Sequence, residues 1–224
     1  MSNKSDAILE VRDLRISFRT NGEWKQVLHG LSYDVFAGRT LGLVGESGSG
    51  KTVSSLACLG LLPEETARID EGTVMFNGVD LLHNSFEEAR KQRGCGIAMV
   101  FQEPMSSLNP SMRVGEQVAE VMKLHLNISS KEAERRVVEL FREVDLPQPE
   151  TIGKRYPHEL SGGQKQRVVI AIALAGNPKI IIADEPTTAL DVTVQRAVID
   201  LLKRLQEERG LGLVFISHDL DVVG

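Results

Sequence analysis

The sequence has few aromatic residues, only two cysteines and no excess of positive charge. Phe, Tyr and Trp make up 4% of the 224 residues, and the formal net charge is −5. A mildly acidic chain is poorly suited to binding nucleic acid through its overall charge, so we expect no nucleic-acid partner. Cys58 and Cys95 form neither a C-x-x-C pair nor a zinc-type cluster, which indicates a reducing, cytoplasmic compartment.

Long apolar runs are also absent. The longest, residues 168–176, has nine residues, whereas a membrane-spanning helix needs about 20. The N-terminal residues lack the apolar core of a signal peptide. We therefore expect a soluble chain that reaches a membrane only by docking on a membrane protein.

Apolar residues make up 42% of the chain, enough for a hydrophobic core in one large domain. Apolar, β-branched runs predict strands at 8–18, 31–35, 40–44, 73–76, 97–101, 180–183 and 213–216. The later runs are continuous rather than alternating, as is typical of parallel strands buried on both faces. Helical spacing predicts helices at 51–61, 114–124, 131–144, 163–174 and 193–209, and Ser129-Ser-Lys-Glu132 predicts a capping box for the helix at 131–144. The pattern therefore predicts an α/β fold with an antiparallel β entry and a helical insert at about 104–160.

The sequence GESGSGKT at residues 45–52 matches the phosphate-binding pattern G-x-x-x-x-G-K-[S/T], and it lies between a predicted strand and a predicted helix. Glycine lets successive backbone N–H groups wrap a phosphate at a helix N-terminus. Lys51 adds a charge for the β and γ phosphates, and the Thr52 hydroxyl can bind Mg²⁺. An ordinary glycine-rich turn is the alternative. The candidate nucleotide-binding residues are Gly45, Glu46, Ser47, Gly48, Ser49, Gly50, Lys51, Thr52 and Val53.

Two acidic residues, Asp184 and Glu185, directly follow the apolar run at 180–183. The carboxyl ends of parallel strands meet at the sheet edge where ligands bind in α/β folds. Asp184 can hold Mg²⁺ opposite Thr52, and Glu185 can face an attacking water as general base. Solvated acids before a turn are the alternative, but the phosphate loop favours the catalytic interpretation.

Four further segments resemble motifs of the ATP-binding cassette (ABC) proteins. They are LSGGQ at 160–164, Phe101-Gln102, Ala189-Leu190-Asp191 and Ser217-His218-Asp219, in the family's order. The resemblance covers nearly the whole chain. It implies a P-loop NTPase cassette over residues 1–224, with a RecA-like parallel-sheet core and an N-terminal antiparallel β subdomain at about 1–103 and 161–224. A helical subdomain would occupy about 104–160, and the C-terminal part of the family domain would be absent after Gly224.

The resemblance also implies roles for individual residues. ATP and Mg²⁺ are the expected cofactors, and Ser161, Gly162, Gly163 and Gln164 would bind the γ-phosphate of an ATP held by a second subunit. Glu185, His218 and Gln102 are the expected catalytic residues, and Thr52, Gln102 and Asp184 the metal ligands. Asp191 would lie at the subunit seam. Phe18 would stack on the adenine. Trp24 is the alternative stacking residue, and Phe18 would then be an ordinary core residue.

Finer similarity points to the peptide and nickel importer branch. It lies in FQEPMSSLNP at 101–110, YPHEL at 156–160 and ADEPTTALDV at 183–192. The branch implies ATP hydrolysis that drives import of peptides or similar small solutes. Its partners would be a second ABC ATPase subunit, two integral-membrane permease subunits and, indirectly, a solute-binding protein. The chain would lie peripherally on the inner face of the cell membrane.

Other functions of P-loop proteins fit less well. A DNA-maintenance cassette would carry a long coiled coil between Lys51 and Ser161, where we see no sustained heptads. A small-molecule kinase would lack the LSGGQ segment and His218. An ATP-dependent translation factor would carry two cassettes in one chain.

Overall fold

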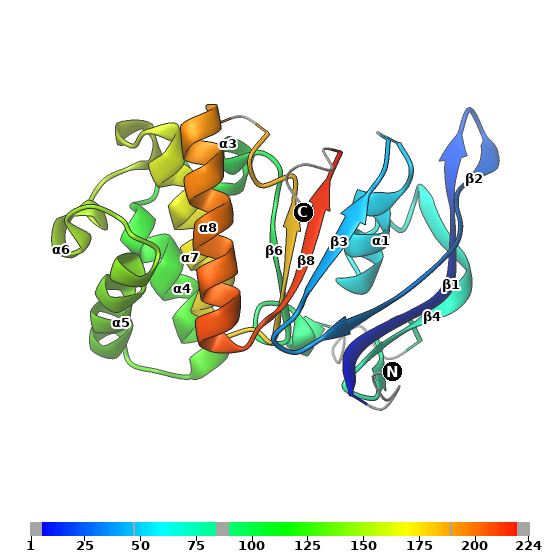
Figure 1. The fold of residues 1–224 in the computed structure, drawn as a ribbon, viewed down its shortest axis with the longest axis horizontal. Helices are drawn as coiled ribbons and strands as arrows, with labels where there is room; N and C mark the ends of the chain where they lie inside the picture. Colours follow the sequence, from blue (N-terminus) through cyan, green and yellow to red (C-terminus); the bar gives the residue numbers. More distant parts are fainter. Residues whose placement is uncertain (1–5, 47, 84–89, 189, 219–224) are drawn as a thin grey trace.

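The N-terminal part of the protein is an antiparallel sheet. The structure, a computed structural model, describes residues 6–46, 48–83, 90–188 and 190–218. The sheet has the strand order β2 (Glu23–Phe36), β1 (Ala7–Thr20), β4 (Ala67–Phe76), β5 (Val79–Asp80). Leu9, Val11 and Ile16 of β1 are fully buried, so one face of this sheet packs into a core. The predicted antiparallel entry is therefore confirmed (Figure 1).

The central sheet is parallel, with the order β3 (Thr40–Val44), β8 (Gly212–Ser217), β7 (Ile180–Asp184), β6 (Ile97–Val100). Every residue of β7 and β8 is buried. Alternate residues face different cores: Ile180 and Ile182 belong to one hydrophobic cluster, and Ile181 and Ala183 to another. Burial on both faces explains why these strands read as continuous apolar runs.

The helices cover the two faces of the parallel sheet unequally (Figure 1). Helix α1 (Lys51–Cys58) lies between the two sheets, and its Ala57 and Cys58 join the same cluster as Ile180. Helices α7 (Gly162–Ala175) and α8 (Val192–Arg209) pack on the opposite face. The parallel sheet therefore separates the N-terminus of α1 from the N-terminus of α7.

Between β6 and α7 the chain forms a helical segment. It contains α3 (Pro104–Ser107), α4 (Val114–Leu126), α5 (Ser130–Glu143), α6 (Pro149–Ile152) and the 3₁₀ turn η1 (Pro157–Glu159). Val118 of α4, Phe141 of α5 and Ile170 of α7 share one buried cluster, so the segment packs directly on α7. Among the described residues, no helix has both the length and the hydrophobicity of a membrane span.

Two local predictions need correction. The helix predicted at 51–61 ends at Cys58, because Gly60 takes the left-handed conformation (φ 59°) and Leu61 N donates to Leu56 O at 2.9 Å. At the start of α5, Ser129 Oγ accepts from Glu132 N as expected. The Glu132 side chain, however, pairs with Arg135 and Arg136, so only half of the predicted capping box forms.

Candidate active site

The phosphate loop joins β3 to α1 at the carboxyl edge of the parallel sheet. Gly48 and Gly50 lie in the left-handed region, at φ 83° and 90°. A Cβ on Gly50 would stand 2.7 Å from Leu28 Cδ1, so both backbone and packing require glycine there. Gly50 also caps α1 without a side chain, and the first turn holds no acidic residue. The helix N-terminus is therefore left favourable for an anion.

Lys51 is anchored across this loop. Its Nζ donates to Gly45 O at 2.7 Å, to Glu46 O at 2.8 Å and to Ser49 Oγ at 3.3 Å. The ammonium group is thus held over the loop rather than extended into solvent. It borders a cavity of about 460 Å³ lined by Val27, Gly48, Gly50, Lys51, Thr52, Val53, Gln102, Glu185 and His218.

Asp184 ends β7 beside the loop, and only 4% of the residue is exposed. Burial raises the pKa of Asp184, a hydrogen bond with Thr52 offsets part of the rise, and the charge of Glu185 adds to it. Keeping this carboxylate ionised therefore costs folding free energy unless a cation lies nearby.

The residues around Asp184 fit a magnesium ion. The carboxylate of Asp184 and the hydroxyl of Thr52 are oxygen ligands of the kind that Mg²⁺ prefers, and Mg²⁺ commonly combines few protein ligands with substrate phosphates. In the part of the chain that the structure describes, no three His, Cys, Asp or Glu side chains cluster as a metal site of their own. The Gln102 amide nitrogen donates to Glu185, so its role as a metal ligand stays a prediction.

Glu185 is the centre of a hydrogen-bonded group. Its Oε2 accepts from Gln102 Nε2 and from Thr188 Oγ1, each at 2.9 Å. Its Oε1 lies 3.2 Å from His218 Nδ1. The structure thus brings together the three predicted catalytic residues, which come from the ends of β6, β7 and β8.

The backbone of Glu185 is itself unusual. Its φ is 45°, in the left-handed region that a non-glycine residue rarely adopts. Glu185 N donates to Ile216 O at 3.0 Å, which holds the turn against the end of β8. Left-handed backbone of this kind costs about 1–3 kcal/mol and is found preferentially at functional sites.

Two residues of this site were missed by the sequence analysis. Thr188 supplies one of the donors to Glu185, and Val27 of β2 forms the cavity wall next to the antiparallel sheet. The three-residue spacing of Glu185 and Thr188 is that of a turn, which is the one signal that could have identified the contact. No sequence pattern marks Val27.

The LSGGQ segment lies away from this cavity. Ser161 caps α7: its Oγ accepts from Gln164 N at 3.3 Å, and Gln164 Oε1 accepts from Ser161 N at 3.2 Å. A Cβ on Gly163 would stand 2.9 Å from Val194 Cγ1 of α8, whereas one on Gly162 would only touch Leu190. Because α7 and α1 pack on opposite faces of the sheet, none of residues 161–164 lines the cavity at Lys51.

Three other predicted residues have local roles here. Asp191 caps α8, and its Oδ1 accepts from Val194 N at 3.0 Å. Phe18 of β1 packs against the core of the antiparallel sheet, and Trp24 is 40% exposed with the Arg68 guanidinium 4.6 Å from its ring. The adenine contact of Phe18 stays a prediction. Ser47, Ala189 and Asp219 lie outside the described residues.

A glycine loop at a helix N-terminus, a lysine held over it, and two acidic residues at the end of the adjacent buried strand define a P-loop nucleotide-binding protein. The comparisons name its family. A family model described as ABC transporter matches residues 28–188. The chain belongs to the ABC transporter family and carries its ATP-binding cassette, as the motifs predicted.

Curated relatives are similar over almost the whole chain. An oligopeptide transport ATP-binding protein of Bacillus subtilis is 50% identical over 216 residues, which are 96% of this chain and 60% of that protein. A dipeptide transport ATP-binding protein of the same organism is 44% identical over 218 residues, 97% of this chain and 65% of that protein. The chain therefore spans about 60–65% of the length of these two relatives.

Solved structures agree with the fold. The ATP-binding cassette MJ0796, in a dimeric post-hydrolysis state bound to ADP and Pi, is 30% identical with a TM-score of 0.83. The match covers 96% of this chain and 89% of that one. The fold class predicted from the sequence is thereby confirmed.

Proposed function

We propose that this chain is the ATP-hydrolysing part of a transporter that imports peptides or similar small solutes through a membrane permease. The observation that carries the catalytic part is the Glu185 carboxylate, held by Gln102, Thr188 and His218 at the wall of the cavity that contains Lys51 and Thr52. The names of the relatives support transport of peptides and not the alternative of a translation or DNA-maintenance factor.

Binding of the nucleotide begins with the phosphates. Gly50, Lys51 and Thr52 at the start of α1 line the cavity, and their N–H groups and the Lys51 ammonium would hold the β and γ phosphates. Lys51 would exchange its present contacts with the Gly45 and Glu46 carbonyls for phosphate oxygens. Thr52 and Asp184 would hold a Mg²⁺ ion, which would neutralise part of the phosphate charge.

Hydrolysis requires a water positioned on the far side of the γ-phosphate from the leaving oxygen. Glu185 is the group at the cavity wall that can accept a proton from this water. Gln102 and Thr188 fix one of its oxygens, and His218 fixes the other, so the carboxylate is preorganised. His218 is 59% exposed at its side chain and can also reach a bound γ-phosphate.

A second subunit would complete the site. Ser161 opens a helix N-terminus that cannot reach the chain's own phosphate loop, because the parallel sheet separates α7 from α1. We infer that each ATP lies between the loop at 45–52 of one subunit and residues 161–164 of the other, with Asp191 near the seam. The dimeric cassette of the solved relative supports this arrangement.

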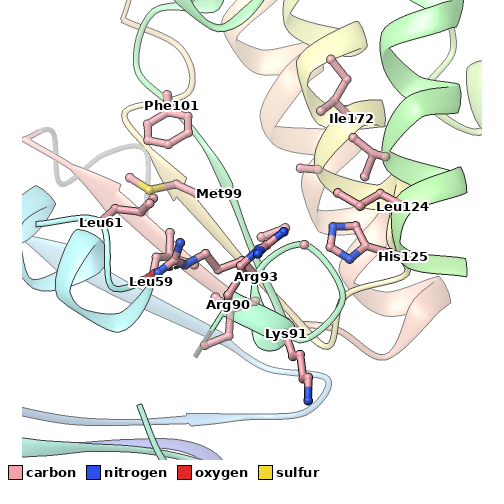
Figure 2. Close-up of a pocket in the computed structure, with 15 residues that line it drawn as sticks. Leu59, Leu61, Arg90, Lys91, Arg93, Met99, Phe101, Leu124, His125 and Ile172 are labelled. Carbon is pink, nitrogen blue, oxygen red and sulfur yellow. Dashed lines mark hydrogen bonds between the residues drawn. The ribbon is translucent and has the colours of Figure 1, made fainter. Parts of the chain in front are cut away.

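A groove next to the site would receive the permease (Figure 2). Its volume is about 580 Å³; Leu61, Met99 and Phe101 lie on one side, and Leu124 and Ile172 face them from α4 and α7. Leu124 is 71% exposed and Phe101 39%. Exposed apolar side chains around a groove are suited to the apolar face of a partner helix. Phe101 precedes Gln102, so a helix seated here would lie next to the catalytic group. Docking at this groove would place the chain at the inner face of the membrane.

Peptide uptake tests the proposal. Cells that carry the Glu185→Gln chain in an otherwise intact transporter should fail to accumulate a labelled tripeptide. The matched control is Glu207→Gln, the same change at an exposed residue of α8, and it should leave uptake unchanged. Uptake at the normal rate with Glu185→Gln, when this is the sole copy, would reject the proposed function.

A further inference from the structure

One buried polar side chain in the described structure has no hydrogen-bond partner at either of its functional atoms. Gln166 is fully buried, and neither Nε2 nor Oε1 is bonded. Buried amides are nearly always paired, because leaving one unpaired costs stability. A conformation in which both atoms gain hydrogen-bond partners would therefore have a lower free energy.

Gln166 lies on the helix that begins with the LSGGQ segment and packs near Gln102. It stands in the second turn of α7, two residues after Gln164. Ala173, roughly two turns further on and thus on the same helix face, lines the groove together with Phe101. α7 also packs against β6 and α3, which flank Gln102 in the chain. Gln166 therefore lies on the face of α7 directed toward the segment 102–108.

Two comparable glutamines show what this fold does with such a residue. Gln117 is 7% exposed; its amide accepts from Asn109 N and donates to Asn109 O and Met112 O. Gln195 donates to Thr187 O and Leu190 O. Each one fixes a loop to a helix through backbone groups. Gln166 makes no contact of this kind.

An adjacent side of α7, about 100° around the helix from Gln166, is firmly attached. Arg167 donates to Val144 O at 2.8 Å and pairs with Asp145, while Arg204 of α8 donates to Glu143 O and pairs with the same Asp145. The end of α5 is thus fixed to α7 and α8, whereas the face with Gln166 carries an unmade contact. A shift of the helical segment about this fixed point would change the surroundings of Gln166.

We propose that Gln166 is a positioning residue whose amide pairs with backbone groups of residues 102–108 when ATP is bound. Through this contact the LSGGQ helix senses the nucleotide at Gln102, and part of the binding free energy comes from pairing the amide. The inference rests on the proposed function, since it concerns the ATP-bound arrangement of the same site.

The test uses the Glu185→Gln chain, which should retain ATP. Gln166→Met and Gln166→Leu remove both polar atoms in two different shapes. Without nucleotide, each should raise the thermal midpoint by at least about 2 °C, because an unpaired buried amide is lost. Titration calorimetry with MgATP should show affinity about tenfold weaker in both. Gln117→Met, where the amide is fully paired, should instead lower the midpoint.

Three outcomes would overturn the inference. MgATP affinity equal to the parent's would mean that Gln166 is equally satisfied in both states, for example by an internal water. Weaker binding in only one of the two variants would assign the effect to side-chain shape. A lower midpoint in both would show that the amide is already paired without nucleotide. Failure of the parent chain itself to bind MgATP would count against the proposed function instead.

Discussion

The Nδ1 atom of His218 lies 3.2 Å from the Oε1 atom of Glu185. The two residues follow neighbouring strands, β8 and β7, so their contact is a direct product of the parallel sheet. Gln102, at the end of β6, reaches the same carboxylate. A change at Glu185 therefore alters the hydrogen bonding of both Gln102 and His218.

Glu185→Gln should abolish most turnover and leave nucleotide binding intact. Loss of a positioned base typically reduces the rate by about 10²–10⁴-fold. Phosphate release from MgATP measures the rate, and calorimetry measures the affinity. Turnover within a few-fold of the parent would show that Glu185 is not the base.

Asp184→Asn should stabilise the chain while removing the proposed Mg²⁺-dependent hydrolysis. The folded-state pKa of Asp184 is raised, so the folded chain holds its proton up to a higher pH than the unfolded chain does. The ionised carboxylate therefore costs stability at neutral pH, and this cost disappears as the pH falls below the ordinary Asp value of about 4.

Thermal unfolding without nucleotide at several pH values checks this sign. The midpoint of Asp184→Asn should exceed that of the parent at pH 7, and the difference should shrink toward pH 4. A midpoint lower than the parent's across this range would mean that the hydrogen bond with Thr52 outweighs the cost of burial.

Gly163→Ala should loosen the contact between α7 and α8. The added Cβ would stand 2.9 Å from Val194 Cγ1, so the helices must separate or Val194 must move. Overpacking of this kind costs about 1–3 kcal/mol. Denaturant unfolding should show that the double variant with Val194→Ala recovers much of the lost stability. Gly162→Ala is the matched control, because its added Cβ would stand 3.5 Å from Leu190 Cδ2, an ordinary contact distance. Equal losses in the single and double variants would exclude the steric explanation.

Base selectivity tests the assignment of Phe18. Stacking gives affinity without reading hydrogen-bonding groups, so GTP should compete with ATP within about tenfold, or 1.4 kcal/mol. Phe18→Ala should weaken binding of both nucleotides, whereas Trp24→Ala should not. The reverse result would transfer the stacking role to Trp24, and a thousandfold preference for ATP would indicate polar readout of the adenine edge.

The sequence predicted the features that depend on local pattern. The phosphate loop needs glycine at fixed spacing before a helix, and Gly48 and Gly50 have the positive φ angles that this requires. The buried strands at 180–184 and 212–217 read as apolar runs because both of their faces are covered. Local chemistry is sufficient for such features.

Other features depend on how distant elements meet. Val27 joins the cavity because β2 passes over the phosphate loop, and Thr188 joins Glu185 because the turn after β7 folds back. The position of Ser161 relative to Lys51 follows from which sheet face each helix covers. No residue spacing encodes these relations. The Glu132 side chain pairs with Arg135 and Arg136 and therefore does not accept from the Ser129 backbone N–H.

The left-handed backbone at Glu185 sets stability against activity at the proposed catalytic centre. A glycine at position 185 would relieve the φ of 45°, and an asparagine would tolerate it better than glutamate does. Together with the buried charge of Asp184, this makes the turn after β7 a place where loss of function increases stability. Selection of variants for heat resistance alone would therefore enrich inactive cassettes with changes at residues 184 and 185.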